Sequence, residues 1–77
     1  MDEEKKVVYE IITGSWAIIK KYGFTKMDDK AWEDLIKDAD TLSDYYRLKG
    51  VRYWHLYRKI IASLVDYVEM IQKGDRL

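Results

Sequence analysis

The sequence predicts an all-α protein, folded as an antiparallel up-down-up bundle of three helices. Apolar side chains recur at steps of three and four in three segments of similar length, the spacing that places side chains on one face of a helix. The chain has no proline, and a glycine follows each of the first two segments, so short turns are expected between consecutive helices. Its 77 residues leave room for one domain with a single core.

The first helix is expected over about residues 2–21. Acidic residues begin it and Lys20 and Lys21 end it, which complements the helix dipole. Gly14 interrupts the pattern and indicates either a close approach of another helix or a tolerated imperfection; we prefer the second interpretation. The predicted inward face comprises Val7, Val8, Ile11, Ile12, Ser15, Ile18, Ile19 and Tyr22, with Tyr9 and Trp16 on one flank.

Glycines are expected to end the first two helices in a left-handed conformation. Gly23 would close the first helix with Ile19 and Phe24 in contact, as in a Schellman motif. Gly50 would close the second helix in the same way.

The second helix is expected over about residues 28–49. Asp28 is the predicted N-cap, with Thr25 as the competing cap. Met27 and Trp32 then occupy the two positions of a hydrophobic staple. The predicted inward stripe is Trp32, Leu35, Ile36, Ala39, Leu42, Ser43 and Tyr46.

The third helix, over about residues 52–73, is predicted to organise the bundle because its apolar stripe is wide enough to contact two neighbours. We expect Trp54 to be deeply buried against both other helices. Gly74 should end the helix, followed by a frayed tail at 75–77. The stripe comprises Trp54, Tyr57, Ile61, Leu64, Val68 and Ile71, widened by Ile60, Val65 and Tyr67.

The composition argues against several classes of protein. Without cysteine, the chain has neither a disulfide framework nor a thiolate metal site. No apolar run approaches the length that spans a bilayer, so we expect no membrane partner. The first six residues are mostly charged and lack the apolar core of a signal peptide, so we expect a cytoplasmic location.

No group of residues has the spacing of a catalytic or metal-binding site. His55 is the only histidine, and Ser15 and Ser63 have no base near them in the sequence. Aspartates four residues apart could hold a hard cation, but residues 38–44 lack the glycine and closing glutamate of a calcium loop. We therefore expect no enzymatic activity, no catalytic residue, no metal and no cofactor.

The candidate site is a basic stretch. Residues 28–44 carry seven carboxylates, whereas residues 47–59 carry five cations and no carboxylate, although the formal net charge is zero. We interpret the basic stretch as a binding surface for a protein partner, or for a second copy in a homodimer. The candidate partner-binding residues are Arg47, Lys49, Arg52, His55 and Lys59.

Residues 45–59 also support an alternative function. They interleave aromatic rings with cations, a combination that single-stranded nucleic acid binding uses. Against this, helical spacing places Tyr46, Tyr53, Trp54 and Tyr57 on inward faces, where they would be core rather than stacking platforms. We therefore rank a non-enzymatic protein-interaction module first and a small nucleic-acid-associated protein second.

The chain also resembles a group of small helical proteins encoded by phages and prophages of Firmicutes. The resemblance covers most of residues 15–70 and involves core and capping positions. It implies a cytoplasmic accessory protein of an integrated phage, with no assigned activity. The residues that carry it are Trp16, Lys20, Lys21, Tyr22, Asp28, Trp32, Glu33, Leu35, Ile36, Ala39, Leu42, Tyr67 and Glu69.

Overall fold

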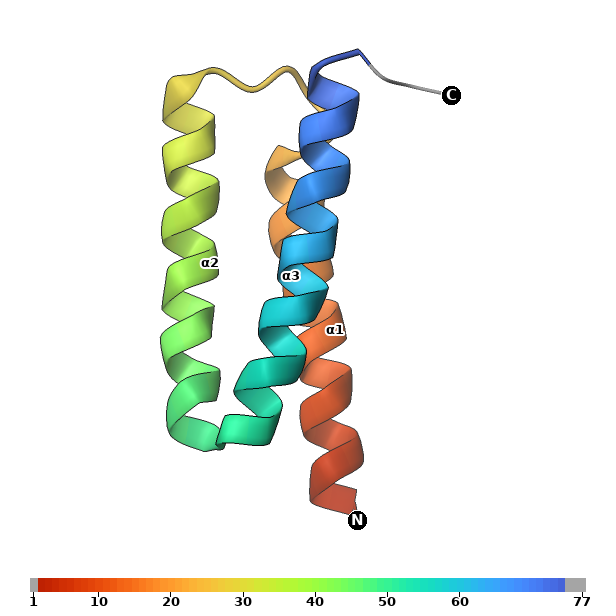
Figure 1. Cartoon of the computed structure of the whole chain (residues 1–77), viewed down its shortest axis with the longest axis vertical. Helices are drawn as coiled ribbons and strands as arrows, with labels where there is room; N and C mark the ends of the chain where they lie inside the picture. Colours follow the sequence, from red (N-terminus) through yellow and green to blue (C-terminus); the bar gives the residue numbers. More distant parts are fainter. Residues whose placement is uncertain (1, 75–77) are drawn as a thin grey trace.

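The computed structural model describes residues 2–74 as three helices, α1 (Asp2–Tyr22), α2 (Asp29–Lys49) and α3 (Val51–Gln72). All three pairs of helices are in contact, so the predicted helical bundle is confirmed, with boundaries within about one residue of those expected. In Figure 1 the α1–α2 connection lies at the upper end of the view and the α2–α3 turn at the lower end. Within residues 2–74 no helix is both long and apolar enough to cross a membrane. The tail predicted at 75–77 lies outside the described residues.

The core lies between the three helices and is centred on Tyr57, which is 1% exposed. The Tyr57 hydroxyl donates a 2.7 Å hydrogen bond to the carbonyl of Ala39, joining α3 to α2. Its ring lies 5.4 Å from the ring of Tyr46. Burial raises the pKa of both tyrosines above the usual range. The buried apolar side chains are Val7, Ile11, Ile18, Ile19, Leu35, Tyr46, Tyr57, Ile61 and Val68.

Four residues predicted to face inward are more exposed than expected. Tyr67 is 53% exposed, so including it in the inward stripe of α3 was wrong. Ile12 and Ile36 are 50% and 47% exposed, so assigning them to the inward faces of α1 and α2 was wrong. Trp54 is half-buried rather than deeply buried. Its indole N–H donates a 2.9 Å hydrogen bond to Ser43 Oγ at the edge between α2 and α3. A buried indole N–H needs such a partner, and the partner lies at the seam rather than in the centre.

The glycine after α1 is required for packing and not for a left-handed turn. Gly23 has no positive φ, and its N–H donates to the carbonyl of Ile19 at 2.7 Å, as in a continuing helix. A Cβ on Gly23 would lie 2.7 Å from Val68 Cγ2, so only glycine lets α3 approach this closely. The Schellman closure predicted here was therefore wrong.

The other glycines differ from the expectation in two of three cases. Gly50 has φ 160° and ψ 144°, which is extended backbone, so the left-handed closure of α2 was also wrong. Gly14 approaches α2, since a Cβ there would lie 3.2 Å from Leu42 Cδ2; the close-approach interpretation is the correct one. Gly74, predicted to end α3, has φ 85° and adopts the left-handed conformation.

The start of α2 is capped as predicted. Asp28 has extended backbone, and its Oδ1 accepts a 2.8 Å hydrogen bond from the N–H of Ala31. Asp28 is thus the N-cap, and the competing assignment to Thr25 was wrong. Met27 and Trp32, the predicted staple pair, are both half-buried against the core.

Gln72, near the end of α3, holds the connection between α1 and α2. Its Nε2 donates to the carbonyls of Gly23 and Thr25 at 3.0 and 2.8 Å. Its Oε1 accepts from the N–H of Met27 at 3.0 Å. One side chain therefore satisfies three backbone groups of a segment that lacks regular hydrogen bonding of its own.

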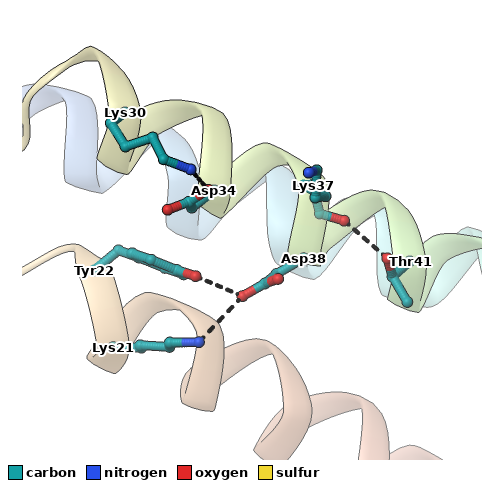
Figure 2. Close-up of polar contacts among 7 residues, drawn as sticks. All are labelled: Lys21, Tyr22, Lys30, Asp34, Lys37, Asp38 and Thr41. Atoms are coloured by element: carbon teal, nitrogen blue, oxygen red, sulfur yellow. Dashed lines mark hydrogen bonds and ion pairs between the residues drawn. The ribbon is translucent and has the colours of Figure 1, made fainter.

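A second polar contact joins α1 to α2, as Figure 2 shows. The Tyr22 hydroxyl donates a 2.8 Å hydrogen bond to Asp38 Oδ2, and Lys21 Nζ lies 3.7 Å from the same oxygen. Within α2, Lys30 pairs with Asp34 at 2.9 Å. The carboxylate of Asp38 therefore receives both of its contacts from the end of α1.

Candidate functional site

The structure divides the predicted basic site into two groups. The first group consists of three cations near the turn between α2 and α3, each within ion-pair distance of a carboxylate. The pairs are Arg47 with Asp44 at 3.2 Å, Lys49 with Glu3 at 3.7 Å and Arg52 with Glu4 at 3.4 Å. Two of these carboxylates come from the first turn of α1. Such surface pairs contribute little stability, but they offset much of the positive charge that the sequence suggested.

The second group lies along a shallow groove between α2 and α3. His55, Arg58 and Lys59 contribute to one wall, and Asp40 and Ser43 contribute to the other. Among the described residues, neither Arg58 nor Lys59 forms an ion pair with a carboxylate. These cations are therefore available to an anionic partner, although Asp40 reduces the positive potential of the groove.

Arg58 was not among the predicted site residues, although it contributes to this groove. Its guanidinium carbon lies 4.8 Å from the centre of the Trp54 ring, a cation–π contact. The sequence contained a signal for this contact, since residues four apart are neighbours on a helix. His55 also lies beside Trp54, with 5.7 Å between the ring centres.

Most of the aromatic rings in residues 45–59 belong to the core. Tyr46 and Tyr57 are buried, and Tyr53 and Trp54 are half-buried, which confirms that their rings face inward. Tyr45 differs, because it is 49% exposed. Its ring lies edge-on to Tyr46 at 5.0 Å. The stretch therefore offers one half-exposed ring for stacking rather than a row of exposed rings.

A different surface carries exposed apolar side chains from α1, from α3 and from Phe24 in the connection that follows α1. We call it the α1/α3 surface. Its members, with their exposed fractions, are Tyr9 (68%), Ile12 (50%), Trp16 (46%), Phe24 (50%), Tyr67 (53%) and Met70 (50%). On α1 a shallow apolar hollow along it is lined by Glu4, Lys5, Val8, Tyr9 and Ile12.

The contacts of α2 place these side chains on one side of the bundle. On α1, Gly14 and Lys21 approach α2, whereas Tyr9, Ile12 and Trp16 lie about half a turn away from that flank.

On α3, Trp54 and Arg58 mark the flank toward α2, and Tyr67 falls on the opposite flank. Met70, three residues after Tyr67, lies beside it toward the outward face of the helix. The rings of Trp16 and Phe24 are 5.9 Å apart, which continues the surface beyond the end of α1.

Other candidate chemistry finds little support in residues 2–74. No group of three or more histidine or acidic side chains in this part of the chain could hold a metal ion. Ser15 is 0% exposed, and its Oγ has no hydrogen-bond partner, so it lies in the core and not at a surface site. Comparisons with protein-family models, with curated proteins and with solved structures found no match. Function is therefore inferred from the surfaces of this chain.

Proposed function

We propose that this protein is a non-enzymatic protein-interaction module that binds its partner through the α1/α3 surface. The observation that carries the proposal is the gathering of six large apolar side chains, each about half exposed or more. Side chains of this size contribute about 100 Å² each when half exposed, or about 600 Å² together. The largest apolar patch on a typical monomer is about 300–600 Å² and is often functional, so this surface lies at the upper end of that range.

The helix arrangement supports a continuous two-helix surface. Lys49 and Arg52 pair with the first turn of α1, and Gln72 bonds the backbone just after α1 ends. These contacts at both ends favour α1 and α3 running in the same direction, with α2 reversed between them, the up-down-up order. Tyr9 and Met70 would then belong to neighbouring parallel helices.

A nucleic-acid-associated protein is the second candidate function. The observation in its favour is the pair of groove cations, Arg58 and Lys59, which lie beside His55 and form no ion pair among residues 2–74. Against it, the other predicted cations are paired with carboxylates, and single-strand binding relies on exposed rings beside cations. The protein partner is therefore ranked first.

The resemblance to phage and prophage proteins supports a cellular setting for this module. We infer a cytoplasmic accessory role, in which the bundle works by holding another protein. The residues that carry the resemblance include Trp16 and Tyr67, which are half exposed on the α1/α3 surface.

Site-specific photo-crosslinking tests the proposal in cells that produce the protein. A photoreactive amino acid in place of Ile12 reports on the α1/α3 surface, and one in place of Lys59 reports on the groove. The exposed Lys37 on α2 is the matched control. We expect protein adducts at 12 and none at 37. Nucleic-acid adducts at 59 without protein adducts at 12 would favour the second candidate, and equal yields at 12 and 37 would refute the module.

A further inference from the structure

We propose that the α1/α3 surface is covered by a second copy of this chain, in a two-fold dimer. This inference rests on the proposed function, because it names the partner of the same surface. In a two-fold dimer the same patch serves both copies, so a single apolar patch on each chain is sufficient.

The area of the surface is close to what such a dimer needs. The six apolar side chains, together about 600 Å² by the estimate above, account for most of the roughly 800 Å² that each partner of a standard interface buries. The half-buried Val8, Leu56 and Ile60 lie along the same flanks and add to this area. A chain of this size does not need a larger partner to cover the patch.

The charge distribution also suits a second copy. None of the six defining side chains is charged, in keeping with the depletion of charged residues at the centres of interfaces. The chain has a formal net charge of zero, so two copies approach without long-range repulsion. The acidic stretch lies on α2, away from the α1/α3 surface. At the start of α3, Arg52 pairs with Glu4, which lines the hollow at one end of that surface, so this cation is offset within the chain.

Sedimentation equilibrium of the full chain tests the dimer. We expect a mass of two chains at high concentration and dissociation on dilution. The variant Tyr9→Glu/Met70→Glu places carboxylates on side chains that are 68% and 50% exposed, so the monomer should keep its helical circular dichroism. Each substitution occurs twice in a two-fold interface, and we expect dimer affinity to fall at least about 100-fold. If that variant does not fold, Tyr67→Lys takes its place.

Leu48→Glu is the matched control, because Leu48 is 86% exposed on α2, outside the α1/α3 surface. This variant should dimerise like the unchanged protein. A monomer at every concentration would overturn the second copy as partner. Protein adducts at position 12 that contain another protein would then still support the module, so the two proposals fail separately. A dimer that tolerates the α1/α3 substitutions but dissociates with Leu48→Glu would overturn the location of the interface.

Discussion

Gln72 provides the sharpest test of how the α1–α2 connection is held. Gln72→Ala removes three hydrogen bonds, to the backbone of Gly23, Thr25 and Met27, at 2.8–3.0 Å. At about 1 kcal/mol for each bond, the expected loss in free energy of unfolding is about 2–3 kcal/mol. A domain of this length has about 4–12 kcal/mol in total. The substitution should therefore lower the urea midpoint clearly, whereas Ala in place of the exposed neighbour Lys73 should not.

Gln72→Glu separates the donated bonds from the accepted one. The carboxylate keeps the acceptor for Met27 but places an oxygen against the carbonyls of Gly23 and Thr25. Protonation restores one donor, so the folded variant should hold this proton more tightly than the unfolded chain. Its stability should then rise as the pH falls toward about 4.3, the usual pKa of a glutamate. Urea midpoints for Gln72→Ala and Gln72→Glu equal to that of the unchanged protein would show that water replaces these bonds, and would refute the reasoning.

Three further predictions concern the stability of the bundle, measured by urea unfolding followed by circular dichroism. Gly23→Ala should lower the free energy of unfolding by about 1–3 kcal/mol, because the new Cβ would meet Val68 Cγ2 at 2.7 Å. Gly14→Ala is the control, because its Cβ meets only the flexible end of Leu42. An equal loss of stability in the control would contradict the packing argument. Asp28→Ala should lower the free energy of unfolding by about 1 kcal/mol, because it removes the N-cap of α2. Asp28→Asn should keep the cap and most of the stability. Equal losses in the two variants would contradict the capping role. Stability should be unaffected by Tyr57 below about pH 10 and should decline above it, because burial raises the pKa of Tyr57 and deprotonation favours the unfolded chain. A Tyr57→Phe variant with an equally steep alkaline decline would contradict this.

Local features of the sequence were enough to predict the helices and much of the core. The helices begin and end within about one residue of the expectation because apolar periodicity delimits them. Gly23 and Gly50 still mark the ends of α1 and α2, although neither adopts the predicted left-handed closure. Asp28 caps α2 as predicted, because its hydrogen-bond partner is three residues along the chain. The buried side chains lie on the predicted stripes for the same reason.

The candidate site could be predicted only in part. The sequence identified a basic stretch, but not that Arg52 would lie beside Glu4, a residue 48 positions earlier. It also identified Tyr9 and Trp16 as flanking residues. However, it assigned Ile12, Ile36 and Tyr67 to the inward faces, and all three are about half exposed. Which flank of a helix stays exposed depends on where its two neighbours sit, and periodicity alone does not contain that information.

The sequence by itself determined three amphipathic helices, the N-cap at Asp28 and the residues available for a core, because these depend on side chains within a few positions of one another. Only the tertiary structure decided that Gly23 has no room for a Cβ beside Val68, that Gln72 bonds three backbone groups of the α1–α2 connection, and which cations have no carboxylate partner among the described residues. Those outcomes depend on the register between helices, which brings together residues nearly 50 positions apart, as the bond from Gln72 to Gly23 illustrates. The same register leaves Tyr9, Trp16 and Tyr67 about half exposed or more, because a bundle of three helices covers only the flanks that face a neighbour.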